Sequence, residues 1–281
     1  MKPHSDFVRL VRDRETGVEA IHAAFLSHAY DLHRHDEWLV GVTDHGVQEF
    51  FCRGARRRST PGRVILIEPG EAHDGEAGTG SGFAYRMLYL PQEWMRASLG
   101  EGPGGEPGFR ATLSDDPVLA SAIRSACVVL SRPAERLRRD AALDGVVHRL
   151  ARHLGRRPPG GPMRSDPSVA RRARERLEDE FAEEIGADAL AEAAGAANRF
   201  QLARAFRAAY GVAPHAYLVQ VRLVRARAEL ARGEPPASVA ATCGFADQSH
   251  LGRRFRRAYG VTPAAYRACC TGVPDGGDEI G

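Results

Sequence analysis

The chain has 281 residues, of which 43% are hydrophobic and 27% are charged, and its formal net charge at pH 7 is +3. This composition is typical of an ordinary globular protein and argues against a disordered chain, a collagen-like fibre or a disulfide scaffold. The length is sufficient for two domains, each with its own core. We find no signal peptide and no apolar run near the roughly 18 residues of a membrane-spanning helix, so we expect a cytoplasmic protein with no membrane partner.

The first hundred or so residues predict short β-strands. Five runs rich in Val, Ile, Phe, Tyr and Leu are separated by turns that contain Gly, Asp and Pro, a pattern typical of a small β-sandwich or barrel. The runs are Phe7 to Arg12, Glu37 to Thr43, Val47 to Cys52, Arg63 to Glu68 and Phe83 to Leu90.

Two amphipathic helices are predicted next, because apolar residues recur every three or four positions from Val118 to Leu130 and from Leu143 to Leu154. Their apolar stripes could pack on the β domain or on a second subunit, and the pattern does not distinguish the two. The stretch from Gly155 to Pro167 predicts a linker stiffened by its prolines, and a new helix is expected to begin near Ser168.

A repeat of 49 residues follows. Residues 194–218 and 243–267 align without a gap, and 13 of their 25 positions are identical. Each copy predicts a short Ala-rich helix, a turn with Gly, and a longer helix that ends at Gly211 or Gly260 in a left-handed conformation. This arrangement is a helix-turn-helix used twice, whose second helix enters the major groove of DNA.

The apolar pairs Leu202 with Phe206 and Leu251 with Phe255 predict the buried stripe of each longer helix. The opposite face is then expected to meet DNA. It carries Phe200, Ala203, Arg204 and Arg207 in the first copy and Ser249, Gly252, Arg253 and Arg256 in the second, with Arg199 and Gln248 at the helix starts.

Arg204 and Arg253 are the expected base readers, because the planar arginine fork can bond O6 and N7 of guanine together. The alternative is that these arginines only solvate an exposed helix face. Residues 195–270 hold twelve Arg against three acidic residues, which leaves +9 for this stretch, so we expect a polyanionic partner.

The helix predicted from Ala213 to Arg232 would connect the two copies. About 20 residues at 1.5 Å each make a helix of about 30 Å. This is close to one turn of B-DNA, about 34 Å, so one monomer could set two recognition helices into successive major grooves.

The repeat resembles the DNA-binding domain of AraC/XylS-type transcription regulators. GFADQSHLGRRFRRAYGVTPAAYR is similar to the C-terminal signature of that family, and RFQLARAFRAAYGVAPHAYL is similar to its first unit, although the turn from Gly195 to Arg199 is one residue longer than usual there. The resemblance covers about Ser168 to Arg267. It implies a sequence-specific regulator of transcription, with double-stranded promoter DNA as partner and a homodimer formed through the helical segment. It favours an activator that contacts RNA polymerase, and repression is the alternative.

Two N-terminal stretches resemble the signature blocks of cupin barrels, in the version that AraC-type regulators use to bind effectors. LHRHDEWLVGVTDHG contains His33, His35 and Glu37, and GRVILIEPGEAH contains His73, with Glu68 where cupins usually have Pro. The resemblance implies that these four residues, the three histidines and Glu37, contact a small-molecule effector.

Other roles of this group stay open. In metal-dependent cupins, residues like His33, His35, Glu37 and His73 bind a divalent metal, a ligand set that suits Fe, Mn, Ni or Zn. Purely structural histidines are the third interpretation. Our expectation is that the protein has no cofactor. Trp38, Tyr89 and Trp94 are candidates either for the pocket lining or for the core.

Together these patterns predict an α+β multidomain protein that is not an enzyme. It has an N-terminal cupin-like β-barrel (jelly roll) with a helical segment, and a C-terminal all-α domain with two helix-turn-helix motifs. The expected segments are a sensing domain (1–110), a helical and possibly dimer-forming segment (111–155), a linker (156–167), a DNA-binding domain (168–270) and a disordered tail (271–281).

Two other functions remain open. The histidines are also compatible with a metal-dependent cupin enzyme fused to a DNA-binding tail, which metal analysis of the purified protein would distinguish. An architectural protein without an effector would instead show weak sequence preference and mainly contacts to the DNA backbone.

Overall fold

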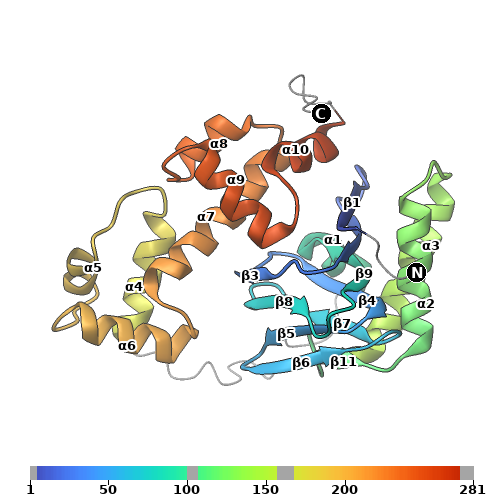
Figure 1. Ribbon diagram of the computed structural model, residues 1–281, viewed down its shortest axis with the longest axis horizontal. Coiled ribbons are helices and arrows are strands. Elements are labelled where there is room, and N and C mark those ends of the chain that lie inside the picture. The colour runs from blue at the N-terminus through green and yellow to red at the C-terminus, as the bar shows by residue number, and fades with distance from the viewer. Residues whose placement is uncertain (1–4, 100–106, 157–167, 273–281) are drawn as a thin grey trace. The chain divides into compact units, whose positions relative to one another are not determined.

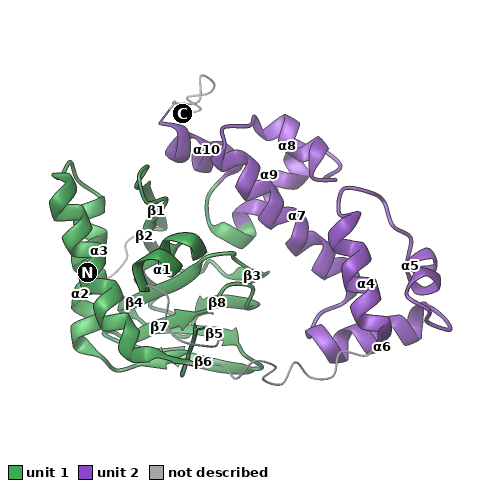
Figure 2. Cartoon of the chain, turned by 180° about the vertical axis from the view of Figure 1, so that it is seen from behind, with its two compact units in different colours: residues 1–159, 257–261 green, residues 160–256, 262–281 purple. Residues whose placement is uncertain are grey.

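The computed structural model describes residues 5–99, 107–156 and 168–272 (Figure 1). The chain divides into two compact units, residues 1–159 with 257–261 and residues 160–256 with 262–281 (Figure 2). Residues 257–261 include the end of a helix that belongs to the 49-residue repeat.

The first unit contains two antiparallel sheets that enclose a common core. The larger sheet has the strand order β1-β2-β9-β4-β7-β11, the smaller β3-β8-β5-β6, and β10 pairs with β12. The strands are β1 (Phe7–Arg12), β2 (Glu19–Phe25), β3 (Tyr30–His33), β4 (Trp38–Gly46), β5 (Gln48–Cys52), β6 (Ala55–Ser59), β7 (Val64–Ile67), β8 (His73–Ala77), β9 (Phe83–Leu90), β10 (Pro107–Phe109), β11 (Leu113–Ser114) and β12 (Leu154–Arg156).

Strand β9 shows that the larger sheet is buried on both faces. Every second residue from Phe83 to Tyr89 packs into the core between the sheets, together with Phe50 of the smaller sheet. Leu88 and Leu90 point the other way, into a second core. Burial on both faces explains why this strand reads as a nearly continuous apolar run.

A helical hairpin, α2 (Pro117–Leu130) and α3 (Arg136–Leu150), covers this second core. Leu119 and Ile123 of α2 and Val146 and Leu150 of α3 are all buried there beside Leu88 of the sheet. The predicted apolar stripes therefore pack on the β domain of the same chain.

The helical run expected through Leu154 was too long. Helix α3 ends at Leu150, a 3-10 turn follows (η1, Ala151–His153), and Leu154 begins β12, which pairs with β10. Arg156, the first residue of the expected linker, belongs to this strand, and the rest of that linker lies outside the described residues. An isolated apolar residue at the end of a helical pattern is equally compatible with a strand. Here the pairing of β10 with β12 places Leu154 in a strand.

Besides the short strands β10, β11 and β12 and the 3-10 turn η1, five elements of the first unit were not predicted: β2, β3, β6, β8 and the helix α1 (Gln92–Leu99). The four strands are rich in Ala, His, Asp or Arg instead of the β-branched and aromatic residues that mark strands in a sequence. Their pairing with neighbouring strands defines them.

The second unit is helical throughout its described elements. These are α4 (Ser168–Asp179), α5 (Ala187–Ala193), α6 (Arg199–Tyr210), α7 (Pro214–Ala231), α8 (Pro236–Thr242), α9 (Gln248–Tyr259) and α10 (Pro263–Thr271). Thr271 of the expected tail thus ends a helix, and residues 273–281 lie outside the described ones. Within the described parts of both units, no helix is long and apolar enough to span a membrane. The predicted fold class is confirmed.

Asp116 joins the two ends of the helical hairpin. Its carboxylate caps α2 by accepting bonds from the N–H groups of Val118 (3.0 Å) and Leu119 (3.1 Å). It also accepts bonds from Arg149 Nε (2.7 Å) and from His153 Nε2 (2.7 Å), behind the end of α3. The bonds from Arg149 above all hold the pKa of Asp116 well below its usual value.

We expect Asp116→Asn to lower the free energy of unfolding by about 1–3 kcal/mol at neutral pH, because buried donors lose a charged acceptor. The folded-state pKa lies below the unfolded value of about 3.9, so this stabilisation is present above about pH 4 and is lost as the pH falls towards the folded pKa. Urea unfolding should therefore show a smaller difference between variant and wild type at about pH 3 than at about pH 7.

Asp115→Asn is the matched control, because the Asp115 side chain is 75% exposed. It should change stability little at either pH. A difference between Asp116→Asn and wild type that is equally large at both pH values would contradict the role given to this carboxylate.

Candidate DNA-reading helices and ligand cavity

The two copies of the repeat have the same structure, residue for residue. Helices α5 and α8, and likewise α6 and α9, begin and end at positions 49 apart. Gly195 and Gly244 turn the chain with φ of 69° and 74°, and Gly211 and Gly260 both have φ of 76°. These left-handed conformations favour Gly. The predicted helix ends are confirmed, and both turns have the same length.

The predicted buried stripe fixes how each recognition helix, α6 or α9, is rotated about its axis. Leu202, Phe206, Leu251 and Phe255 are at most 2% exposed. Phe206 packs on Tyr217 of α7 with ring centroids 5.4 Å apart, and Phe255 packs on the equivalent residue of α10 at 5.7 Å.

The predicted DNA-facing side chains lie on the opposite face of these helices. Arg199, Phe200, Arg204, Arg207, Gln248, Ser249, Arg253 and Arg256 are exposed, and Ala203 and Gly252 are partly exposed. The structure therefore brings these ten residues together on two equivalent faces. Their contact with DNA stays a prediction.

The start of α6 is fixed by a cap that sequence reasoning missed. The Asn198 side chain accepts bonds from the N–H groups of Phe200 (3.1 Å) and Gln201 (2.9 Å), and the Gln201 side chain accepts one from Ala197 N–H (2.6 Å). Gln201 is therefore engaged with the backbone. In α9 the corresponding cap is Asp247, which accepts a bond from His250 N–H at 2.6 Å.

Four of the predicted DNA-facing arginines differ from those of helix α4 in their ion pairs, whereas Arg199 lies 3.8 Å from the Asp188 carboxylate. On α4, Arg171 and Arg176 each lie within ion-pair distance of a Glu four residues on. Among the described residues, no carboxylate lies at that distance from Arg204, Arg207, Arg253 or Arg256. Unneutralised arginines on a fixed helix face suit a polyanion better than mere solvation of the helix.

The first unit contains a cavity in the core between its two sheets. Its wall includes Tyr30, His33, Phe50, His73, Tyr85 and Tyr89. Aliphatic side chains of β4 and β7 complete the apolar part of this wall. Of the aromatic candidates, Tyr89 therefore lines the cavity, whereas Trp38 and Trp94 belong to the second core beside the helices.

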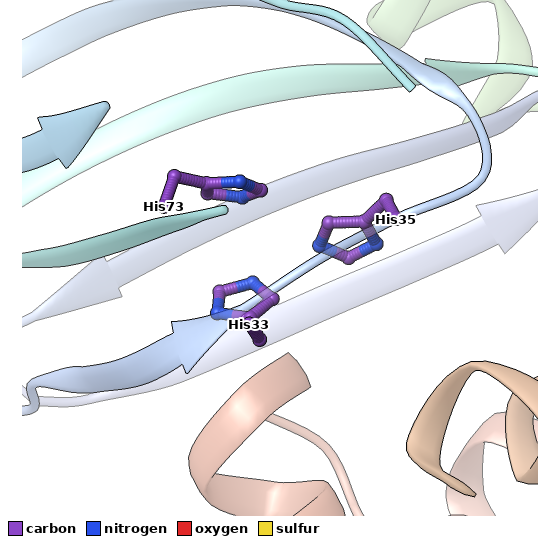
Figure 3. A group of neighbouring side chains, drawn as sticks. All are labelled: His33, His35 and His73. Carbon is purple, nitrogen blue, oxygen red and sulfur yellow. The ribbon is translucent and has the colours of Figure 1, made fainter. Parts of the chain in front are cut away.

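Three of the four predicted effector residues meet beside this cavity. His33, His35 and His73 are buried, and one ligand atom from each lies within 4.8 Å of the others (Figure 3). His33 and His73 face each other because β3 pairs with β8 at these positions. Glu37 is not part of this group of three, and its predicted contact with an effector stays a prediction.

Hydrogen bonds orient two of these imidazoles. Nδ1 of His33 donates to the carbonyl of Asp31 (2.6 Å), and Nδ1 of His73 donates to the carbonyl of Glu71 (2.9 Å). In each neutral ring Nε2 is then the acceptor. Burial lowers the pKa of His73, against the opposing effect of the bond to Glu71.

This group has two chemical uses. Three imidazoles, two of them oriented by backbone carbonyls, fit a divalent metal of the Zn, Ni or Fe kind. The same nitrogens could accept hydrogen bonds from an organic ligand.

Two tyrosines that sequence reasoning missed add a polar spot to the cavity. The hydroxyl groups of Tyr30 and Tyr85 lie 2.9 Å apart. Burial raises the pKa of Tyr85 to about 12 and raises that of Tyr30 as well, so both stay neutral. The inward position of Tyr85 in the alternating pattern of β9 is the signal that could have found this residue.

Glu68, which stands where cupins usually have Pro, attaches the two-stranded sheet β10–β12 to the cavity wall. It is 6% exposed and accepts a bond from Phe109 N–H at 2.5 Å. Arg53 bonds Glu68, Glu71 (2.5 Å) and the carbonyl of Phe109 (2.9 Å). Through Glu71, this cluster is also connected to His73.

Two family models match the chain. The AraC-like ligand binding domain matches residues 15–147, and the Helix-turn-helix domain matches residues 190–268. The chain belongs to the AraC-type transcription regulators. The predicted resemblance is thereby confirmed for both parts of this regulator.

One curated relative is the uncharacterized HTH-type transcriptional regulator YbfI of Bacillus subtilis strain 168. It is 25% identical over 230 residues, which cover 81% of this chain and 83% of YbfI. Its match extends over both parts of the AraC-type regulator described here.

Among solved structures, this regulator is similar to ToxT of Vibrio cholerae. The apo form of a ToxT variant has a TM-score of 0.57 at 12% identity and covers 92% of this chain and 100% of ToxT. The wild-type protein bound to an unsaturated fatty acid has a TM-score of 0.51 at 12% identity, with 98% and 99% covered. At this identity the likeness concerns the fold alone.

Proposed function

We propose that this AraC-type regulator activates transcription from sites read by α6 and α9, in response to a small molecule bound in the cavity of its first unit. The observation that carries this proposal is the matched pair of recognition helices, with exposed, unneutralised arginines at positions 49 apart. We further infer a cytoplasmic homodimer that contacts RNA polymerase. The inferences on localisation, dimer formation and RNA polymerase rest on the AraC-type family to which the chain belongs.

The connecting helix supports simultaneous use of both copies. Helix α7 has 18 residues, close to the predicted 20. At 1.5 Å per residue it is about 27 Å long, and successive major grooves on one side of B-DNA lie about 34 Å apart. One chain can therefore reach two grooves with short extensions at either end of α7.

Arg253→Ala should weaken binding to a duplex selected from a random pool by about 5- to 150-fold, equal to about 1–3 kcal/mol, because a bidentate contact to guanine is lost. Binding to unselected DNA should change far less. Fluorescence anisotropy measures both affinities, and a new selection with the variant should show one relaxed base position.

Arg232→Ala is the control for loss of positive charge. Arg232 is 68% exposed, pairs with Glu229 at 2.6 Å, and lies at the C-terminal end of α7, outside α6 and α9. This variant should keep the selectivity of the wild type. Equal losses on selected and unselected DNA for Arg253→Ala would contradict base reading and favour a contact to phosphate.

The cavity suggests the kind of effector. Its described wall offers aliphatic and aromatic surface, tyrosine hydroxyls, imidazoles, the Gln48 amide and the Asp74 carboxylate, and contains no Lys or Arg. This chemistry suits a small, mainly apolar molecule with one or two polar groups. The unsaturated fatty acid in one ToxT structure is a ligand of that protein, and it supports an apolar ligand in a fold of this kind.

A route from the cavity to the second unit is available within the first unit. His73 bonds the backbone of Glu71, Glu71 bonds Arg53, and Arg53 holds Phe109 of β10. Strand β10 pairs with β12, the last described element before residue 168. We propose that a ligand on His73 biases the position of β12, and through it an equilibrium between arrangements of the two units.

A screen of small organic molecules by thermal unfolding should find a compound that stabilises the protein and also changes its affinity for the selected duplex. His73→Ala should weaken binding of this compound about 10-fold, as expected for one hydrogen bond of about 1.4 kcal/mol. The thermal shift at a fixed ligand concentration should fall accordingly.

His148→Ala, which removes an exposed histidine of α3, is the control and should keep the full shift. A stabilising compound whose effect is the same in His73→Ala and wild type would contradict the cavity as its site. A compound that binds without changing DNA affinity would contradict the coupling of the two units.

The cluster of His33, His35 and His73 favours one further candidate, a metal-dependent enzyme joined to a DNA-binding domain. Elemental analysis of the purified protein tests it. A stoichiometric transition metal that His73→Ala loses would support this candidate, and its absence would leave the organic effector.

A further inference from the structure

Phe200 is an exposed aromatic residue on a face that otherwise carries arginines. Its exposed fraction is 63%, and it is the one aromatic side chain among the exposed large hydrophobic residues of the described chain. The cap at Asn198 fixes its backbone, and Leu202 and Phe206 hold its helix from the opposite side. Exposing a phenylalanine to water is unfavourable, so this position calls for an apolar partner.

The surroundings of Phe200 indicate DNA as that partner. The Arg199 guanidinium lies 5.1 Å from the centre of the Phe200 ring and is itself exposed. Arg204 and Arg207 follow on the same face, without a carboxylate at ion-pair distance among the described residues. Arg199 also lies 3.8 Å from the Asp188 carboxylate. A partner protein with an apolar patch would have to tolerate the positive charges of Arg204 and Arg207, whereas a DNA groove attracts them.

The edges of the bases in the major groove are mostly hydrogen-bonding groups. Their one methyl group is at C5 of thymine, with which apolar side chains such as Phe make contact. We propose that Phe200 selects a thymine in the half of the DNA site that α6 reads, by packing its ring on that methyl group. This inference rests on the proposed function, in which α6 and α9 read DNA.

The second copy lacks this contact, because Ser249 occupies the equivalent position at the start of α9. Arg204 and Arg253 are equivalent as well, so both halves of the site share the arginine contact and only one half requires the thymine. The DNA site is therefore asymmetric, and the protein binds it in one orientation.

The spacing on the helix gives the position of this thymine. Arg204 lies four residues after Phe200, which is about 6 Å along the helix axis. Base pairs are about 3.4 Å apart. The thymine therefore lies within about two base pairs of the base that Arg204 reads.

The test replaces each thymine of a selected duplex, one at a time, by deoxyuridine, which pairs in the same way but lacks the methyl group. With the full-length protein, one replacement should weaken binding about 3- to 10-fold, the effect of one lost methyl contact. Phe200→Ala should bind the thymine and deoxyuridine duplexes equally well. Selection with Arg204→Ala should relax a position within about two base pairs of this thymine.

Two further variants control the test. Phe200→Ser installs the side chain found in the second copy and should lose the thymine preference in the same way, and Ser249→Ala should keep it. All four variants change exposed positions, so their thermal unfolding should match that of the wild type.

The outcomes separate this inference from the function on which it rests. If wild type and Phe200→Ala respond equally to every deoxyuridine replacement, or if no replacement matters, the thymine contact is wrong while DNA reading stands. If the wild type selects no duplex at all, both are overturned.

Discussion

The burial of one apolar stripe on each recognition helix determines what this regulator can present to DNA. Phe206 and Phe255 are fully buried and pack on tyrosines of the following helices, α7 and α10. Because this packing fixes the rotation of α6 and α9, the arginines of both helices must point away from the core. Everything proposed about base reading follows from this orientation, including the role of Phe200.

The first unit uses its larger sheet as a wall between two cores. One core lies against the helical hairpin, where Asp116 ties the two helix ends together, and the other contains the cavity with His33 and His73. Glu68 and Arg53 connect the cavity wall to β10, and β10 pairs with β12. The helical hairpin thus covers one face of the larger sheet, and the cavity on the other face is connected to β12 by hydrogen bonds. We propose that a ligand in the cavity shifts β12 through this connection.

The parts of the structure that depend on local signals could be predicted from the sequence. The ends of α6 and α9 follow from helical periodicity and from glycines such as Gly211, and the repeat predicted the second copy from the first. The proximity of His33 and His73 was predicted only through the resemblance to cupin barrels. Local signals could not predict it, because the pairing of β3 with β8 is non-local and both strands lack typical strand residues. The bond between Tyr30 and Tyr85 and the end of α3 at Leu150 depend equally on neighbours distant in sequence.

Guanine-N7 methylation interference on a selected duplex tests the central claim most directly, because Arg204 and Arg253 are proposed to bond guanine O6 and N7. The account predicts two clusters of interfering guanines, about 10 base pairs apart, on one side of the duplex. Arg253→Ala should remove interference at one cluster only. Interference confined to a single cluster in the wild type, or found at no guanine, would contradict the claim that one chain reads two successive major grooves.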